Sequence, residues 1–183
     1  SIDGVLIIKP TVHSDDRGYF VETYHKEKLK DLGLDYNFVQ DNQSLSLHAG
    51  TVRGLHYQLN PKPMTKLVKV LHGAIYDVAV DIRVGSPTYG QYVGAILTSQ
   101  NQRQLLIPAG FAHGLCTLAP NTVVTYKIDP FYDSSLDRAF AWDDPDIGID
   151  WSVSNPIVSQ KDRNAPPLRK AINNFKFQKR DNT

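Results

Sequence analysis

The sequence predicts an all-β protein, built as a sandwich or barrel of short antiparallel strands. Short runs rich in β-branched and aromatic residues alternate with turn signals through the middle of the chain, and this combination is typical of such folds. The turn signals recur roughly every 10–13 residues, which favours a sandwich or barrel. They are Gly50, Asn60-Pro61, Gly73, Gly85-Ser86-Pro87, Ser99-Gln100-Asn101, Pro108-Ala109-Gly110 and Pro120-Asn121.

The clearest strand is predicted over Ile75–Arg83, where side chains alternate between two faces. One face carries Tyr76, Val78, Val80 and Ile82, and the other carries Asp77, Ala79, Asp81 and Arg83. Further along, Ile107–Phe111 is predicted to be the end of one strand and a turn into the next.

Helix signals are few and lie toward the two ends of the chain. His25–Leu32 carries two leucines three apart and is followed by Gly33 as a stop signal, which favours two helical turns. A second short helix is expected near Arg169–Asn174. The polar stretch Phe175–Thr183 is expected to fray as a flexible tail.

Length and composition indicate one domain over residues 1–183. Hydrophobic residues make up 41% and charged residues 21% of the chain, which argues against disorder. Twenty Lys and Arg against nineteen Asp and Glu leave a formal charge of +1. This balance gives no broad field for nucleic acid or an acidic membrane. An anionic ligand would therefore depend on a few local cations.

The chain carries no signal for a membrane or for secretion. No apolar stretch approaches the ~18 residues needed to span a bilayer, and residues 1–8 contain no basic leader. The only cysteine, Cys116, cannot form an intramolecular disulfide and is interpreted as a small buried hydrophobe. We expect a cytoplasmic enzyme.

Six histidines suggest a metal site, but their spacing gives little support to one. Metal-binding β-barrels usually supply two histidines at i and i+2 of one strand. In Gly54–Gln58, Gln58 stands where the second ligand after His56 would lie. Three scattered ligands remain a minor alternative, and we predict no metal.

Arg53 and His56 lie three residues apart in one predicted strand. Regular alternation would direct them to opposite faces, but Gly54 between them favours a bulge that turns both toward one pocket. The alternative interpretation is that Arg53 is a surface charge and His56 a core histidine with its hydrogen bonds satisfied.

Other polar residues carry no clear signal by themselves. Lys66 begins an apolar strand, where a lysine usually extends to solvent. Tyr126 and Tyr132 follow apolar runs, where tyrosines mostly pack. Asp162 lies in a polar run typical of a solvated loop, and spacing does not reveal whether it meets His56.

Many short blocks, in order, resemble the dTDP-4-dehydrorhamnose 3,5-epimerases as far as about Leu168. They are Asp15-Asp16-Arg17-Gly18-Tyr19-Phe20, Phe38-Val39-Gln40-Asp41-Asn42, Val52-Arg53-Gly54-Leu55-His56-Tyr57-Gln58, Lys66-Leu67-Val68, Asp77-Val78-Ala79-Val80-Asp81-Ile82-Arg83, Gly85-Ser86-Pro87-Thr88-Tyr89-Gly90, Ile107-Pro108-Ala109-Gly110-Phe111-Ala112-His113-Gly114, Tyr126-Lys127, Trp142-Asp143-Asp144-Pro145, Ile149-Asp150-Trp151 and Lys161-Asp162. The resemblance implies a cupin-like jelly-roll barrel with a few short peripheral helices. It also implies a metal-free, cofactor-independent homodimer whose substrate is dTDP-4-keto-6-deoxyglucose.

The same resemblance implies the roles of the site residues. His56 would be the catalytic base oriented by Asp162, Tyr126 the acid on the opposite face of the sugar, and Lys66 the cation beside the enolate oxygen. Tyr132 stays open as an alternative proton donor that would otherwise flank the sugar. The remaining residues implied to bind substrate are His113 in the sugar pocket, Arg17 and Arg53 at the diphosphate, Gln40 and Asn42 at the nucleoside end, and Phe20 and Glu22 from the partner's N-terminal arm.

These residue types suit the chemistry. A hydrogen next to a carbonyl is removed by a base that works near pH 7, and histidine has the nearest ordinary pKa. A cation then stabilises the enolate oxygen, while arginine forks suit a diphosphate. Because the substrate carries its own electron sink, we expect no cofactor.

The sequence also departs from the family pattern. Met64-Thr65 precede Lys66, and Ala139-Phe140-Ala141 precede the tryptophan, where many members have other residues. A single-site 3- or 5-epimerase therefore remains an alternative, followed by a 3,4-ketoisomerase and by a sugar-binding barrel without activity.

Overall fold

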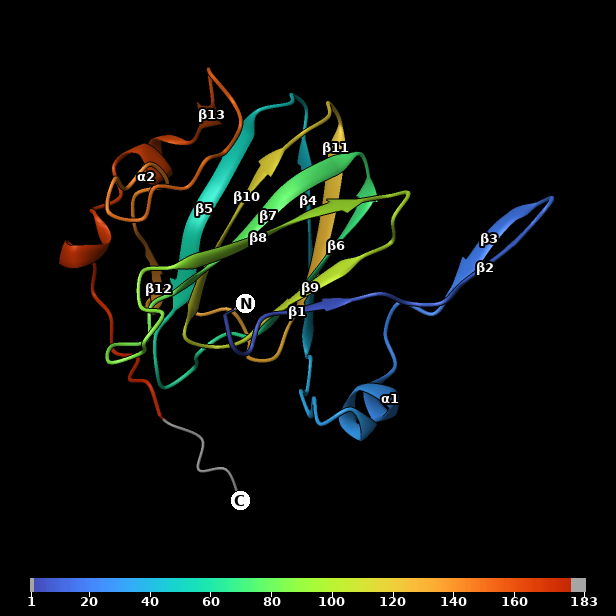
Figure 1. The fold of residues 1–183 in the computed structure, drawn as a ribbon, viewed down its shortest axis with the longest axis horizontal. Helices are drawn as coiled ribbons and strands as arrows, with labels where there is room; N and C mark the ends of the chain where they lie inside the picture. The colour runs from blue at the N-terminus through green and yellow to red at the C-terminus, as the bar shows by residue number, and fades with distance from the viewer. Residues whose placement is uncertain (1, 179–183) are drawn as a thin grey trace.

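Two antiparallel sheets pack face to face in the computed structural model, which describes residues 2–178 (Figure 1). The first sheet contains, in spatial order, β1 (Leu6–Ile8), β9 (Gln104–Ile107), β6 (Lys66–His72), β11 (Thr122–Ile128) and β4 (Gln40–Ser46). The second contains β12 (Asp137–Ala139), β5 (Thr51–Gln58), β10 (Phe111–Thr117), β7 (Ala74–Asp81) and β8 (Tyr92–Thr98). A short strand, β13 (Ile157–Val158), lies parallel to β5. This arrangement is the cupin-like jelly roll that the resemblance implies.

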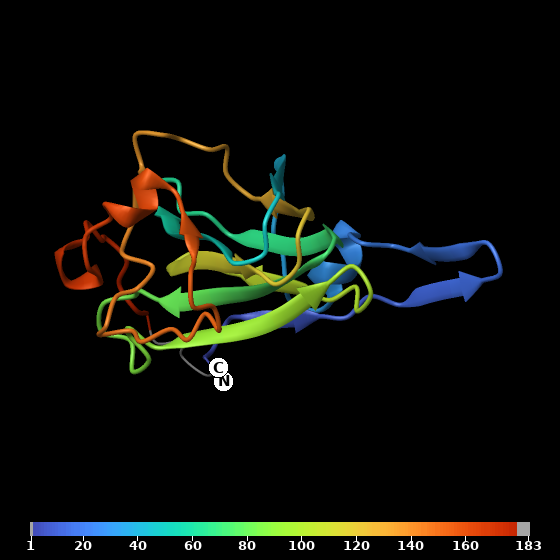
Figure 2. The ribbon, with the colours of Figure 1, turned by 90° about the horizontal axis from the view of Figure 1, so that it is seen from above.

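The second sheet is buried on both of its faces. The face toward the first sheet packs a cluster that includes Val68, Ile75 and Val124. The opposite face packs against the C-terminal part of the chain through a second cluster that includes Val78 and Trp151. The C-terminal segments therefore lie over the back of the sheet (Figure 2).

The predicted strand over Ile75–Arg83 is confirmed as β7, and its two faces belong to the two clusters. It ends at Asp81, two residues earlier than predicted. Asp81 accepts hydrogen bonds from the main-chain amide and the guanidinium of Arg83, which turn the chain out of the sheet. Cys116 is buried in the second cluster, as predicted.

The first helix is confirmed as α1 (Lys26–Asp31), because the His25 side chain caps the amide of Lys28 and Leu29 is buried. The second helix was predicted too long. Only a 3₁₀ turn, Leu168–Lys170, forms there, and the chain is already extended at Ala171. None of the helices within residues 2–178 combines the length and apolar character needed to cross a membrane.

The expectation of a frayed tail is wrong for its first residues. Phe175 is buried, and its carbonyl accepts a hydrogen bond from the amide of Val84. The amide of Phe177 in turn donates to the carbonyl of Val84. The side chain of Phe175 reaches the core cluster and so anchors this segment. Residues 179–183 lie outside the described residues.

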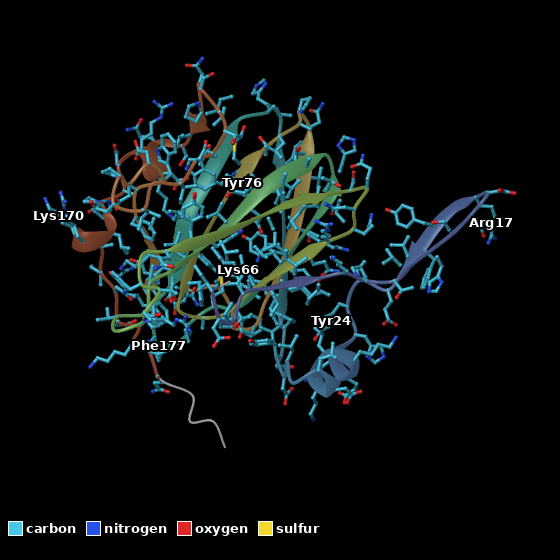
Figure 3. The ribbon with its side chains drawn as sticks, in the orientation of Figure 1. Arg17, Tyr24, Lys66, Tyr76, Lys170 and Phe177 are labelled. Atoms are coloured by element: carbon cyan, nitrogen blue, oxygen red, sulfur yellow. The ribbon has the colours of Figure 1, made fainter. Side chains whose placement is uncertain are left out.

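A hairpin of β2 (Val12–Asp15) and β3 (Gly18–Val21) projects away from the two sheets (Figures 1 and 2). Arg17 lies at its tip (Figure 3). Most of the hairpin is exposed, including Phe20 at 70%. An arm of this kind leaves apolar area in water unless a second chain covers it.

The bulge predicted at Gly54 is confirmed. His56 pairs with His113 and Arg53 pairs with Leu115, so Gly54 and Leu55 together face the single residue Gly114. Gly54 has φ +121°, and a Cβ there would lie 2.6 Å from the Cα of Gly114. Only glycine fits both the backbone conformation and the close approach.

Gly54→Ala is therefore expected to lower the free energy of unfolding by about 2–4 kcal/mol, because it adds backbone strain and a backbone clash. Gly85→Ala is the matched control. Gly85 also has positive φ, but open space surrounds its Cβ direction, so a loss of about 1 kcal/mol is expected. Urea unfolding of both variants measures the difference, and equal losses would contradict the importance of the close approach.

Candidate active site

A cavity of about 460 Å³ lies between the two sheets and extends to α2 (Gln160–Arg163). A second cavity of about 320 Å³ adjoins it and shares His56, Lys66, Tyr126 and Lys161. The predicted site residues that line one or both of them are Gln40, Asn42, Arg53, His56, Lys66, His113, Tyr126, Tyr132 and Asp162. The interior of the jelly roll thus brings together residues from six separate elements and one loop.

His56 and Asp162 are joined by a hydrogen bond at the cavity wall. His56 Nε2 lies 2.7 Å from Asp162 Oδ1, and the main-chain amide of Gly54 donates to Oδ2 of the same carboxylate at 3.4 Å. With Nε2 as the donor, Nδ1 of His56 keeps a free lone pair. The Asp162 side chain is 4% exposed, whereas that of His56 is 31% exposed. The solvated-loop interpretation of Asp162 is therefore wrong.

Local pairing explains how Asp162 reaches a histidine far away in the sequence. β13 runs parallel to β5, with Ile157 opposite Thr51 and Val158 opposite Val52. Ser159 then caps α2 by accepting a hydrogen bond from the amide of Asp162. The short helix therefore begins beside the bulge. Burial opposes ionisation of Asp162, but the hydrogen bond and charge of His56 outweigh it and hold the pKa of the carboxyl below its ordinary value.

A second histidine–carboxylate pair lies deeper in the barrel. His113 Nε2 is 2.6 Å from Asp77 Oδ1, and both side chains are buried. Burial lowers the pKa of His113 although Asp77 opposes the shift, so the neutral ring is favoured at pH 7. Asp77 Oδ2 is buried and has no hydrogen-bond partner within residues 2–178. Such a group is costly to bury, so its position in the site calls for a functional explanation.

Lys66 lies at the start of β6 and points into the cavity rather than to solvent (Figure 3). It is 8% exposed, which overturns the expectation for a lysine at a strand end. Burial lowers the pKa of its ammonium to about 8, against the opposing charges of Asp137 and Asp77. Its Nζ lies 5.9 Å from the centre of the Tyr126 ring.

The two candidate tyrosines differ in their surroundings. Tyr126 is part of β11 in the first sheet, across the cavity from His56 in the second. Burial raises its pKa, and the charge of Asp137 adds to the effect, so its hydroxyl stays protonated at pH 7. Tyr132 is 51% exposed, and its hydroxyl donates to Asp137 Oδ2 at 3.3 Å. These contacts favour Tyr126 as the group that faces a bound ring.

The predicted binding residues fall into two groups within the cavities. Gln40 and Asn42 are joined by a hydrogen bond of 2.8 Å, and Gln40 Oε1 accepts from the amide of Tyr132. Arg53 lies in the cavity beyond His56, where its guanidinium donates to Ser46 Oγ and to the carbonyl of Leu45. Arg53 and His56 thus line one cavity, as the bulge predicts. Arg53 is also exposed, as its interpretation as a surface charge expects.

Three predicted binding residues lie outside the cavities of their own chain. Arg17 is paired with Asp15 at the tip of the arm, with its side chain 89% exposed. Phe20 and Glu22 line a different hollow beside α1, and Glu22 pairs with Lys28. The fold of one chain does not bring these residues to His56.

Sequence reasoning missed three charged residues of the site: Asp77, Asp137 and Lys161. Asp77 had a signal, because it is a carboxylate inside an apolar strand, between Tyr76 and Val78. Lys161 stands in the family block Lys161-Asp162, but its polar segment looks solvated. Asp137 had no signal, because it stands in a polar segment outside the family blocks. Among residues 2–178, no three His, Cys, Asp or Glu side chains cluster closely enough to hold a metal ion.

A jelly roll with a cavity lined by ionisable groups is the architecture of the cupin-like sugar-nucleotide isomerases. Comparisons with a family profile, with related sequences and with solved structures place this chain in that class. Residues 1–170 match the sequence profile of the family described as dTDP-4-dehydrorhamnose 3,5-epimerase. An enzyme of that name from Methanothermobacter thermautotrophicus is 49% identical over 172 residues, covering 92% of each chain. The chain therefore belongs to the dTDP-4-dehydrorhamnose 3,5-epimerase family.

Solved structures agree with this assignment. The Bacillus anthracis dTDP-4-dehydrorhamnose 3,5-epimerase, crystallised with TDP and PPi, is 51% identical with a TM-score of 0.88, over 90% of this chain and 94% of that one. The Legionella pneumophila dTDP-6-deoxy-D-glucose-3,5-epimerase, in complex with dTDP-4-keto-L-rhamnose, is 43% identical with a TM-score of 0.88, over 92% and 90%.

Burial of the Lys66 ammonium is expected to cost stability. Lys66→Met should raise the free energy of unfolding by about 3 kcal/mol at pH 7, since burial lowers the pKa of Lys66 to about 8 in the folded protein. Between pH 8 and 10.5 the unfolded chain binds the proton that the folded one lacks, so wild-type stability rises with pH and the gap closes. Chemical denaturation at pH 7 and pH 9.5 measures the difference in free energy of unfolding between Lys66→Met and the wild type. A variant less stable than the wild type at pH 7 would contradict this account.

Proposed function

We propose that the chain is a cytoplasmic, cofactor-independent epimerase that inverts carbons 3 and 5 of dTDP-4-keto-6-deoxyglucose. The product would be dTDP-4-keto-L-rhamnose, the compound bound in the Legionella pneumophila relative. One observation carries the proposal. A histidine with a free lone pair and a protonated tyrosine face each other across one cavity from opposite sheets, with a buried lysine beside them.

In the proposed mechanism, neutral His56 removes the hydrogen from carbon 3 or carbon 5 through Nδ1. The imidazolium that forms is stabilised by the adjacent Asp162 carboxylate, in the manner of other His–Asp pairs. The 31% exposure of the ring leaves it open to substrate and to proton exchange with water.

The electrons released from the carbon–hydrogen bond move onto the carbonyl oxygen at carbon 4. Lys66 would stabilise the resulting enolate as an ammonium ion in a largely dry site, where such a charge acts strongly. His113, tied to Asp77, lines the same cavity and would help fix the sugar.

Inversion requires that the new proton arrive on the opposite face of the ring. The Tyr126 hydroxyl would deliver it to the carbon, and the enolate electrons would form the new carbon–hydrogen bond. The tyrosinate then regains a proton from water while His56 loses its own to water, so each inversion leaves both residues in their starting states. No electron acceptor is needed, because the carbonyl itself holds the charge.

The test is incubation with dTDP-4-keto-6-deoxyglucose in deuterated water, followed by NMR at carbons 3 and 5. We expect deuterium at both carbons, together with the inverted product. Label at one carbon would instead identify a single-site epimerase. Intact folded protein that exchanges neither carbon would overturn both the proposed reaction and the proposed substrate.

Variants separate the base from the acid. His56→Asn should slow exchange by about 10²–10⁴-fold, whereas His72→Asn, at an exposed end of β6, should exchange at the wild-type rate. Tyr126→Phe should still exchange deuterium through His56 but without inversion, because the proton can return only to its original face. Tyr132→Phe should invert normally. Loss of inversion in Tyr132→Phe alone would reassign the acid.

We further propose that two copies form a dimer in which each arm completes the other copy's site. Support comes from the exposed arm, which carries Arg17 and Phe20 away from its own cavity. It also comes from apolar residues exposed on the first sheet, among them Leu45 and Leu71. A second chain would cover both surfaces and add the Arg17 guanidinium to Arg53 near a diphosphate.

Mixing two inactive variants tests this dimer. Arg17→Ala/Phe20→Ala keeps the body of the site but loses the arm, whereas His56→Asn keeps the arm but loses the base. After the two are unfolded and refolded together at equal amounts, about a quarter of the sites should be intact in a symmetric dimer. Activity near that fraction is expected, and a mixture no more active than its parts would contradict a shared site.

A further inference from the structure

Asp137 is a partly buried carboxylate on which several groups of the site converge. It begins β12 and pairs with Gln58 of β5, so its position on the cavity wall is fixed by the sheet. Its side chain is only 16% exposed and lies 2.6 Å from Lys161 Nζ. The same oxygen, Oδ2, accepts the hydrogen bond from the Tyr132 hydroxyl.

Lys66, on the wall of the same cavity as Asp137, needs a negative charge nearby to stay protonated. Lys66 lines the same cavity and is buried, and a buried ammonium without a counter-charge loses its proton. No carboxylate forms a direct ion pair with Lys66 among the residues 2–178. The ionisable groups that act on Lys66 or line its cavities are Arg53, His56, Asp77, His113, Tyr126, Tyr132, Asp137, Lys161 and Asp162.

We propose that Asp137 is a positioning residue of the active site, whose carboxylate, on the wall of the cavity that Lys66 also lines, holds the Lys66 side chain in its ammonium form while Lys161 tempers its charge. The role of Lys66 in this inference rests on the proposed function. The electrostatic part does not, because it concerns the free protein. Of the charges that favour the protonated lysine, Asp137 contributes more than Asp77, and it also raises the pKa of Tyr126.

The Asp137–Lys161 pair allows a sharp test of the inference, because neutralising either member should shift the pKa of Lys66 in opposite directions. Removing the charge of Asp137 takes a negative charge away from the cavity and leaves Lys161 unpaired there. Both consequences disfavour a second cation at Lys66. Removing the charge of Lys161 instead leaves Asp137 uncompensated, which favours the Lys66 ammonium. If the substitutions merely loosened the structure around β12 and α2, the pKa of Lys66 would shift in the same direction in both variants.

The first test measures the pKa of Lys66 without substrate, by NMR of protein labelled at lysine Cε, with the Lys66 signal assigned from Lys66→Met. Starting from about 8, Asp137→Asn should lower the value by about one unit, and Lys161→Gln should raise it. Asp133→Asn is the matched control, because Asp133 lies in the loop just before β12 and also pairs with a lysine, Lys62, but lies outside both cavities. It should leave Lys66 unchanged.

The second test follows deuterium exchange into dTDP-4-keto-6-deoxyglucose against pH. In Asp137→Asn the loss should be about fivefold at pH 8, where the wild-type lysine is half protonated, and should narrow toward pH 6. Asp137→Glu should restore the wild-type profile. A constant loss at every pH, or an unmoved Lys66 in Asp137→Asn, overturns the inference. Absence of exchange in the wild type would sink the proposed function but leave the first test decisive.

Discussion

The close approach of two glycines, Gly54 and Gly114, is the constraint on which the site depends. It allows two residues of β5 to face one residue of β10, and that extra residue turns Arg53 and His56 into the same cavity. The amide of Gly54 then faces Asp162, which β13 and α2 bring to the bulge. A side chain at either glycine would separate the strands and with them the base from its carboxylate.

The interior of the barrel carries charges that cost stability. Asp77 keeps an oxygen without a partner among the described residues, and Lys66 is nearly as buried as the aliphatic core. In a medium of low dielectric these groups act strongly on one another and on a bound substrate. The two apolar clusters, one on each face of the second sheet, supply the burial that offsets this cost.

Having two sheets rather than one matters for the proposed chemistry. His56 and Asp162 approach the cavity from the second sheet and the helix beside it, while Lys66 and Tyr126 belong to the first. A ring bound between the sheets would therefore meet a base on one face and an acid on the other, as an inversion requires. Asp137, at the edge strand β12, connects the two sides through Lys161, Tyr132 and the field that it exerts on Lys66.

The sequence alone determined the all-β class, the strand β7 and the bulge at Gly54, because alternation, turn residues and glycine act over a few neighbouring positions. The family blocks also pointed to His56, Lys66, Tyr126 and Asp162. Only the tertiary structure decided that Asp162 meets His56, that Lys66 is buried, that Asp77 pairs with His113 and that Asp137 lines the cavity, since burial and charge depend on strands distant in sequence. It likewise docked Phe175, where a frayed tail was expected, because this side chain packs into the apolar cluster on the outer face of the second sheet.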